Sequence, residues 1–218
     1  MVNNMLYNNF VNINVDNLNS NIDYIKNNYN YKYYILDVTN NAFNHGMYII
    51  NYLNNKIDYS YTTSFNDCVL IRKYTKDIPI IYSGLITKEN IFDLIINNVI
   101  VVIKDKYIFK DIVNENIKDN LNVILNIDLD KYNGINSKYD ILDILELIKD
   151  NKYINVTGIK AKVSEDNYDD FKYVISPLKD LQLIILNDEN DKNKIKLSNS
   201  IKLDYSIYGF NNVKKKFV

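Results

Sequence analysis

Charged and polar side chains recur in pairs, two residues apart, at the ends of short apolar segments. Side chains two apart on a strand point the same way, so each pair is expected to share one face of its strand. The pairs are Asp37 with Thr39, Asn126 with Asp128, Lys160 with Lys162, and Lys202 with Asp204. If these faces meet inside one fold, the interior holds roughly balanced carboxylates and ammoniums.

Buried charges cost on the order of several kcal/mol each unless they are paired. We therefore expect Asp37 or Asp128 to form an ion pair, with Lys162 or Lys202 as the partner. Two interpretations stay open at this point. The charged side chains line a pocket for a small zwitterionic or anionic ligand, or they form an internal salt-bridge network that has only a structural role.

His45 is the only histidine and Cys68 the only cysteine of the chain. With an ordinary pKa of about 6.5, a histidine can act as a general base, although a capping or packing role for His45 is the favoured interpretation. Cys68 lies in an apolar helical stripe with Val69 and Ile71, which predicts a buried thiol rather than a nucleophile. A single cysteine excludes an internal disulfide and agrees with a reducing compartment.

The bulk composition limits the class of protein. The 218 residues carry a net charge of −1, which favours neither nucleic acid nor an anionic membrane surface as a partner. The longest apolar run, residues 98–103, is far shorter than the roughly 20 residues of a membrane span. The N-terminus has no signal-peptide pattern. We expect a soluble, cytoplasmic protein that folds as a single domain over residues 1–218.

Short apolar, β-branched segments alternate with helix-like stretches along the chain. Such segments are typical of strands that are buried on both faces of a parallel sheet. The eight expected strands are residues 31–38, 59–63, 78–83, 99–103, 122–128, 155–162, 181–186 and 201–208. Between them, Ser64, Thr87 and Ser137 are expected to cap helices. This order predicts an α/β fold, a closed eight-stranded β/α barrel, and the absence of a G-x-G-x-x-G motif argues against a Rossmann sheet.

Three segments resemble, in order and spacing, motifs of the alanine racemase N-terminal domain family. Residues 37–46 (D-V-T-N-N-A-F-N-H-G) resemble V-V-K-A-N-A-Y-G-H-G, and residues 125–134 (L-N-I-D-L-D-K-Y-N-G) resemble L-K-I-D-T-G-M-N-R-L-G. Residues 201–209 (I-K-L-D-Y-S-I-Y-G) resemble V-R-P-G-I-A-L-Y-G. Weaker similarities at residues 15–21, 80–84 and 158–162 extend the resemblance over about residues 11–210, and it implies a barrel of the same type.

The resemblance implies a pyridoxal phosphate (PLP) site at the C-terminal mouth of the barrel. The family's Schiff-base lysine falls on Thr39, whose hydroxyl cannot form an imine. Lys202 stands at the position of the arginine that contacts the pyridine nitrogen, and it keeps the charge without the forked donor set. Asp204 replaces the glycine of the phosphate turn, where a carboxylate repels a phosphate dianion.

The remaining family positions also differ, while part of the first motif is retained. The fifth-strand lysine falls on Asn126, the substrate arginine on Asn133, the sixth-strand histidine on Lys162 and the phosphate-side serine on Asn187, which Asp188 follows. Asn41, Phe43 and His45 keep the family's residue types. The resemblance also implies a C-terminal β domain that supplies a catalytic tyrosine to the partner subunit, and this domain is expected to be missing because the sequence stops at Val218.

These departures predict a degenerate alanine racemase-like barrel, without racemase activity, bound PLP or metal, that acts as a binding, structural or regulatory protein. A PLP-dependent amino-acid racemase, and an enzyme with new chemistry from Lys162, Lys202, Asp128 or His45, stay open as alternatives. A protein partner or homo-oligomer and a small polar ligand are expected as partners. The residues expected to line the mouth are Thr39, Asn41, Phe43, His45, Asn126, Asp128, Lys162, Asn187, Lys202 and Asp204.

Overall fold

The computed structural model of the chain describes residues 12–130, 133–186, 197–204 and 206–209. Strands and helices alternate along these residues. The strands are β1 (Tyr33–Asp37), β2 (Tyr59–Thr62), β3 (Ile80–Tyr82), β4 (Val99–Ile103), β5 (Leu121–Ile127), β6 (Ile154–Ala161), β7 (Leu183–Leu186) and β8 (Ser200–Leu203). The helices are α1 (Val15–Asn28), α2 (Thr39–Phe43), η1 (Met47–Ile49), α3 (Ile50–Leu53), α4 (Phe65–Tyr74), α5 (Ile91–Ile96), α6 (Lys106–Asn114), α7 (Lys138–Ile148) and α8 (Tyr168–Ile175).

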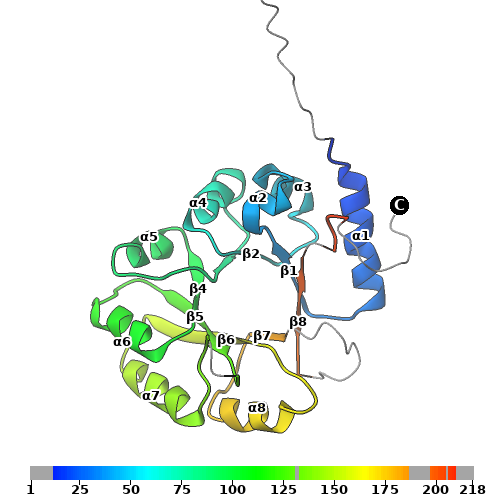
Figure 1. Cartoon of the computed structure of the whole chain (residues 1–218). Helices are drawn as coiled ribbons and strands as arrows, with labels where there is room; N and C mark the ends of the chain where they lie inside the picture. Colours follow the sequence, from blue (N-terminus) through cyan, green and yellow to red (C-terminus); the bar gives the residue numbers. More distant parts are fainter. Residues whose placement is uncertain (1–11, 131–132, 187–196, 205, 210–218) are drawn as a thin grey trace, which may run out of the picture.

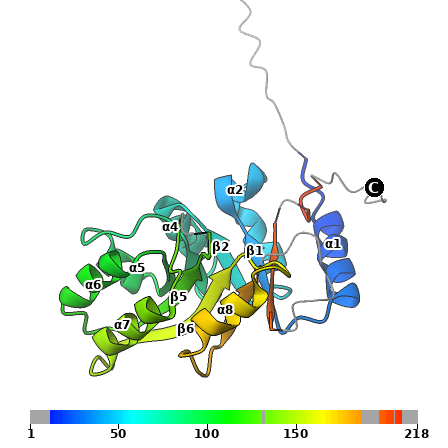
Figure 2. The ribbon, with the colours of Figure 1, turned by 60° about the horizontal axis from the view of Figure 1, so that its bottom comes forward.

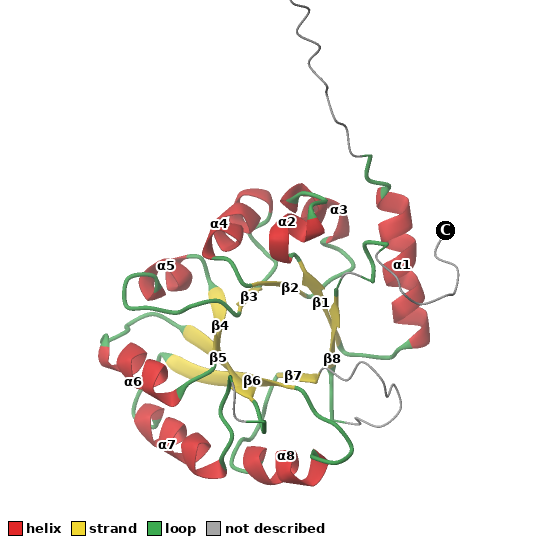
Figure 3. Ribbon diagram, in the orientation of Figure 1, coloured by secondary structure: helices red, strands yellow, loops and turns green. Residues whose placement is uncertain are grey.

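All eight strands are parallel and close into a barrel in the order β1 to β8 (Figures 1 and 3). Closure is made by β1 and β8, where Ile35 is level with Lys202. The helices surround the outside of this ring, and α1 lies beside β8 in both views (Figures 1 and 2). Asn21 of α1 donates a side-chain hydrogen bond to the carbonyl of Ile207 at 2.9 Å, so α1 is joined to the segment that follows β8. The expected barrel is confirmed.

Two apolar cores flank the strands, because successive side chains of a strand alternate between its faces. The larger core packs the outer faces of the strands against the helices, with Phe109 of α6 and Phe171 of α8 fully buried. The smaller core fills the barrel interior and contains Ile35, Tyr59, Tyr61, Ile81, Ile100, Val102, Ile124, Leu183 and Ile185. The interior of such barrels is a packed core rather than a channel, so polar chemistry is restricted to its ends.

Helix capping follows the expectation at two of three positions. The Oγ atoms of Ser64 and Ser137 accept hydrogen bonds from the backbone N–H groups of Asp67 and Asp140, at 3.4 and 3.1 Å. The expectation for Thr87 is wrong, since α5 begins after Asn90. The Asn90 side chain instead accepts a hydrogen bond from the backbone N–H of Thr87, which closes a turn before the helix.

The eighth strand is shorter than expected. It ends at Leu203, and the residues described after it form a turn that carries Ser206 and Tyr208. Asp204 causes this early end, since its side chain accepts a hydrogen bond from the backbone N–H of Ser206 at 3.1 Å and bends the chain there. Within the described residues no helix is long and apolar enough to span a membrane.

Candidate functional site

A layer of polar side chains closes the apolar interior at the C-terminal ends of the strands. Four of its six members follow a residue of the interior core by two positions, as Lys104 follows Val102 and Asn126 follows Ile124, whereas Lys160 and Lys202 follow Gly158 and Ser200. Because side chains two residues apart lie on the same face of a strand, the inward face of these strands changes from apolar to polar at the mouth. We call the set the mouth layer, and its members are Asp37, Ser83, Lys104, Asn126, Lys160 and Lys202.

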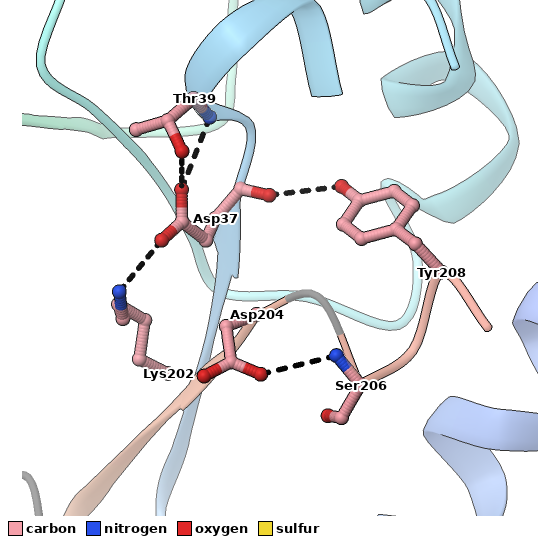
Figure 4. Close-up of polar contacts among 6 residues, drawn as sticks. All are labelled: Asp37, Thr39, Lys202, Asp204, Ser206 and Tyr208. Atoms are coloured by element: carbon pink, nitrogen blue, oxygen red, sulfur yellow. Dashed lines mark hydrogen bonds and ion pairs between the residues drawn. The ribbon is translucent and has the colours of Figure 1, made fainter. Parts of the chain in front are cut away.

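Asp37 joins β1, α2 and β8 through one side chain (Figure 4). It is 3% exposed, and its Oδ2 accepts from Lys202 Nζ at 2.6 Å. Its Oδ1 accepts from the hydroxyl of Thr39 at 2.8 Å and from the backbone N–H of Thr39 at 3.0 Å. The hydroxyl of Tyr208 donates to the Asp37 backbone carbonyl at 2.9 Å. Both carboxylate oxygens are thus occupied, and the expected ion pair between Asp37 and Lys202 is present.

The Lys202 ammonium is stabilised by two neighbours. Burial opposes its charge, but the Asp37 carboxylate outweighs burial, so the pKa of Lys202 lies above its ordinary value. Its Nζ also lies 5.0 Å from the centre of the Tyr61 ring, a cation–π distance. Burial, with a smaller contribution from Asp37, raises the pKa of Tyr208 far above the usual phenol value, so this phenol stays protonated as a donor to Asp37.

Lys104 and Lys160 lack the carboxylate that Lys202 has. Lys104 Nζ donates to the Ser83 carbonyl at 2.8 Å, and Lys160 Nζ lies 3.4 Å from Oδ1 of Asn126. Burial lowers the pKa of both lysines, and for Lys160 the ammoniums of Lys202 and Lys104 lower it further against a weaker opposing effect of Asp37. Within the described part of the chain, neither lysine forms an ion pair. The mouth layer therefore carries excess positive charge.

The other acids near the mouth, Asp128 and Asp204, accept hydrogen bonds from nearby backbone N–H groups. Asp128 accepts from the backbone N–H groups of Asn133 and Asp130 at 2.7 and 3.1 Å, which holds the loop after β5 in place. Of the two acids expected to pair with a lysine, Asp37 forms the pair, and the oxygens of Asp128 are occupied by backbone N–H groups. Asp204 caps Ser206 in the same way, as Figure 4 shows. Carboxylates committed to backbone N–H groups are less available to neutralise Lys104 and Lys160.

The retained first motif has a local structural role. Residues 40–44 all have positive φ values and form a left-handed turn after β1, a conformation that asparagine tolerates better than most residues. The Asn41 side chain accepts from the backbone N–H of Met47 at 2.9 Å. His45 Nδ1 lies 3.1 Å from the Phe43 carbonyl, and the His45 and Phe43 rings pack on Tyr208 at 4.9 and 5.1 Å. Packing and turn formation account for these residues.

Lys162 and Asn187 take no described part in the site. Strand β6 ends at Ala161, so Lys162 stands beyond the barrel wall and is exposed. Of the two lysines expected to pair with an acid, Lys202 forms the pair, and the lysine of β6 that enters the mouth layer is Lys160 rather than Lys162. Asn187 and Asp188 lie outside the described residues. Sequence reasoning missed Lys104, although the alternation of Ile100, Val102 and Lys104 along β4 carries the signal.

A cavity opens beside the mouth layer between the ends of β3, β4 and β5. It has a volume of about 590 Å³, within the range of small-ligand sites. Its wall mixes apolar side chains with charged and amide ones, and the lining residues are Gly84, Leu85, Ile86, Val102, Ile103, Lys104, Asp105, Ile108, Asn133, Gly134 and Asn136. Among the residues described, no group of histidine, cysteine or acidic side chains is arranged to hold a metal ion.

A parallel β/α barrel whose polar residues gather at the C-terminal mouth belongs to the class of barrels that place ligand or substrate sites there. The family model described as "Alanine racemase, N-terminal domain" matches residues 13–172. The chain therefore belongs to the alanine racemase N-terminal domain family.

Solved alanine racemases share the fold at low sequence identity. The enzyme of Oenococcus oeni superposes with a TM-score of 0.80 at 18% identity, covering 93% of this chain and 60% of that chain. The enzyme of Clostridium difficile 630 gives a TM-score of 0.77 at 17% identity, covering 93% of this chain and 59% of that chain. This chain thus spans about 60% of those enzymes. A comparison with curated protein sequences gives no match.

The residues present at the mouth do not fit a PLP held as the family motifs imply. Thr39 has no amine for an imine, and its hydroxyl and backbone N–H both donate to Asp37. At the turn after β8, Asp204 accepts the Ser206 N–H, a backbone donor of the kind that a phosphate would use. A carboxylate at that turn also repels a phosphate group, so both ends of the cofactor lack a matching partner.

Proposed function

We propose that this chain is a non-racemising member of its family that binds a small polar ligand at the mouth of the barrel without a covalent link. The proposal covers the loss of PLP and of amino-acid racemisation. The ligand takes the space at the strand ends that the fold leaves open next to the mouth layer. The solved relatives are alanine racemases, and that activity belongs to those enzymes, to which this chain is 17 and 18% identical.

The hydrogen bonds of Asp37 are the observation that carries the proposal. At the end of β1, where the family's imine-forming lysine falls by motif, Thr39 and Lys202 instead share the two oxygens of one buried carboxylate. Both groups are satisfied without a cofactor. A buried carboxylate with two committed oxygens is costly to disrupt, so a ligand is expected to bind beside this arrangement rather than through it.

The excess positive charge of the mouth layer supports binding over a purely structural network. In a structural network each buried ammonium has a carboxylate partner, because an unpaired charge is destabilising. Here Lys202 has one, whereas among the described residues Lys104 and Lys160 contact a carbonyl and an amide oxygen and no carboxylate. The open cavity beside Lys104 offers space for a ligand.

Incubation with PLP tests the proposal. Purified protein is mixed with excess PLP, its visible absorption is recorded, and the sample is then reduced with borohydride and mapped by mass spectrometry. We expect no stoichiometric adduct on Lys104, Lys160 or Lys202, and no more labelling of these lysines than of the exposed Lys162. A parallel assay is expected to show no interconversion of the alanine enantiomers.

A stoichiometric, borohydride-trapped adduct on any lysine of the mouth layer would overturn the proposal. It would favour the alternative of a PLP-dependent racemase, in which a lysine other than the one implied by the motif forms the imine. Lys162 serves as the internal control in this experiment because it is a solvent-exposed lysine only two residues from Lys160.

A further inference from the structure

We propose that the ligand of this mouth is an organic acid, with its carboxylate between Lys104 and Lys160 and its apolar body in the adjoining cavity. The inference rests on the proposed function, since it names the class of ligand for the same mouth. It adds Lys104 and Lys160 as binding residues, and it requires a ligand with a carboxylate at one end and an apolar group at the other.

Strand register brings the two lysines to one level. Ile103 of β4 is paired with Leu125 of β5, so Lys104, the next residue, is level with Asn126. Asn126 is in turn paired with Lys160 of β6. The two ammoniums therefore stand on either side of Asn126, on strands separated by one strand, or roughly 10 Å between backbones. Long lysine side chains from such positions can both reach one small anion.

Hydrogen bonding and charge leave both ammoniums available to that anion. A lysine ammonium has several donors, and each of these uses one on a described acceptor, the Ser83 carbonyl for Lys104 and Asn126 Oδ1, at 3.4 Å, for Lys160. The largest charge effects on Lys160 come from two other ammoniums. An anion placed there removes this repulsion and supplies acceptors for the remaining donors.

Asn126 connects this anion position to the cavity. Its Nδ2 donates to the Asn133 carbonyl at 2.6 Å, and Asn133 and Gly134 form part of the cavity wall. Lys104 itself lines the cavity. The anion position and the cavity are thus adjacent, because Lys104 borders both of them. One molecule can therefore occupy both.

The cavity wall includes a cluster of apolar side chains that can hold the body of the ligand. Ile86 and Val102 are buried in the wall, whereas Leu85 is 70% exposed and Ile108 38% exposed at its rim. Exposed apolar side chains at a rim gain stability when a ligand covers them. The acid in the wall, Asp105, accepts from the N–H groups of Tyr107 and Ile108 through Oδ1, so one of its carboxylate oxygens caps the start of α6.

Calorimetric titration of the full chain in low salt tests the inference. The probes are hexanoate and benzoate, with acetate, 1-hexanol and inorganic phosphate as comparisons. We expect hexanoate and benzoate to bind with a Kd of about 1 mM or tighter, and acetate, hexanol and phosphate to bind at least about tenfold more weakly. The ratio of the hexanoate affinity to the hexanol affinity measures the contribution of the carboxylate, and it can be obtained with the wild-type protein alone.

Variants then assign the carboxylate to its lysines. Lys104→Met and Lys160→Met are each expected to weaken hexanoate binding by about tenfold, and the matched control Lys162→Met to leave it unchanged within about twofold. Circular dichroism verifies that each variant is folded, and Lys104→Gln and Lys160→Gln replace any methionine variant that is not.

Three results would overturn the inference. The first is the absence of binding heat for both acids at about 10 mM, and the second is wild-type affinity in the Lys104 and Lys160 variants. The third is acetate or phosphate binding as tightly as hexanoate, because the apolar side chains of the cavity wall would then contribute nothing to binding. None of these results depends on PLP, whereas a trapped PLP adduct refutes the proposed function itself, so the two failures are distinguishable.

Discussion

Asp37 is the residue that joins the beginning and the end of the barrel. Asp37 of β1 and Lys202 of β8 are 165 residues apart in the sequence, and their 2.6 Å ion pair links the two strands at the mouth. Because Asp37 is buried, the ion pair is screened by solvent much less than a surface pair. Removal of the carboxylate leaves a largely buried ammonium without its partner, which is the costly way to break such a pair.

Asp37→Asn is expected to lower the free energy of unfolding by about 2 kcal/mol, the cost of leaving the largely buried Lys202 ammonium without its carboxylate. Urea denaturation followed by circular dichroism measures it. The control is Asp169→Asn, which removes the exposed 2.7 Å pair with Lys172 and is expected to cost less than about 0.5 kcal/mol.

A second substitution separates the ion pair from the other hydrogen bonds of Asp37. In Asp37→Asn with Lys202→Met, the unpaired ammonium is gone, so we expect recovery of roughly half or more of the lost stability. Equal losses in Asp37→Asn and Asp169→Asn would contradict the structural importance of the pair.

Lys160 is expected to destabilise the free protein at neutral pH. Its folded-state pKa is lowered from 10.5 by burial and by Lys202 and Lys104, so the charged form is disfavoured in the folded state. The folded state binds fewer protons than the unfolded state between the lowered pKa and 10.5, so stability rises with pH in that window. The pKa of Lys202 is raised instead, so its contribution is lost only above 10.5.

Lys160→Met is therefore expected to be more stable than the wild type at pH 7, by about 1 kcal/mol, with the difference shrinking as pH approaches 10.5. Urea denaturation at several pH values measures the difference, and Lys162→Met, at an exposed position, is expected to show no such trend. A Lys160→Met variant that is less stable than the wild type at pH 7 would mean that Lys160 has a structural role.

At the scale of elements, β5 and β6 determine where the mouth layer stands. The register between these strands shifts between Val123 and Ile124, opposite the stretch that contains Gly158. A Cβ at Gly158 would lie 2.7 Å from the Leu183 carbonyl and 2.8 Å from Leu183 Cβ. Glycine is thus required for β7 to approach β6 at this point, two residues below Lys160.

Gly158→Ala is expected to lower the free energy of unfolding by roughly 1–3 kcal/mol, because the added methyl group meets backbone that cannot move without disturbing the barrel. Thermal and urea unfolding measure the loss. Asn155→Ala, an exposed position on the same strand, is the control and is expected to change stability little. A neutral Gly158→Ala variant would show that β6 and β7 have more space than the structure indicates.

Most of the fold could be predicted from the sequence, because strands buried on both faces leave unmistakable apolar segments. All eight strands occur close to their expected places, and their order requires closure between β1 and β8. The end of β8 was less predictable, since the capping of Ser206 by Asp204 depends on a local hydrogen bond rather than on hydrophobic pattern.

The site was predictable only in part. The pairing of Asp37 with Lys202 follows from shared strand faces, but the choice between Lys160 and Lys162 depends on where β6 ends. Either Asp37 or Asp128 was expected to pair with a lysine, and spacing did not show that nearby backbone N–H groups occupy the oxygens of Asp128. Such competition between local and long-range partners is decided by three-dimensional geometry, which spacing along the chain does not carry.

At the scale of the whole molecule, large apolar side chains remain exposed on the outer helices. Ile96 of α5 is 80% exposed, Tyr107 of α6 70%, and Tyr139 of α7 72%. We expect the chain to self-associate through apolar surface of this kind, because burial of such groups is favourable. Sedimentation velocity over a range of concentrations measures this, and a sharp monomer species at high concentration would contradict it.

The central claim is that the chain's own residues occupy the hydrogen-bonding groups that PLP would need at the mouth. The structure of a crystal grown with excess PLP tests this claim most directly. We expect the Asp37–Lys202 pair at 2.6 Å and the Asp204–Ser206 contact at 3.1 Å to persist, with no density linking PLP to a lysine. Density for PLP bound covalently to a mouth lysine, with its phosphate on the Ser206 N–H and the Asp204 side chain displaced, would contradict the claim.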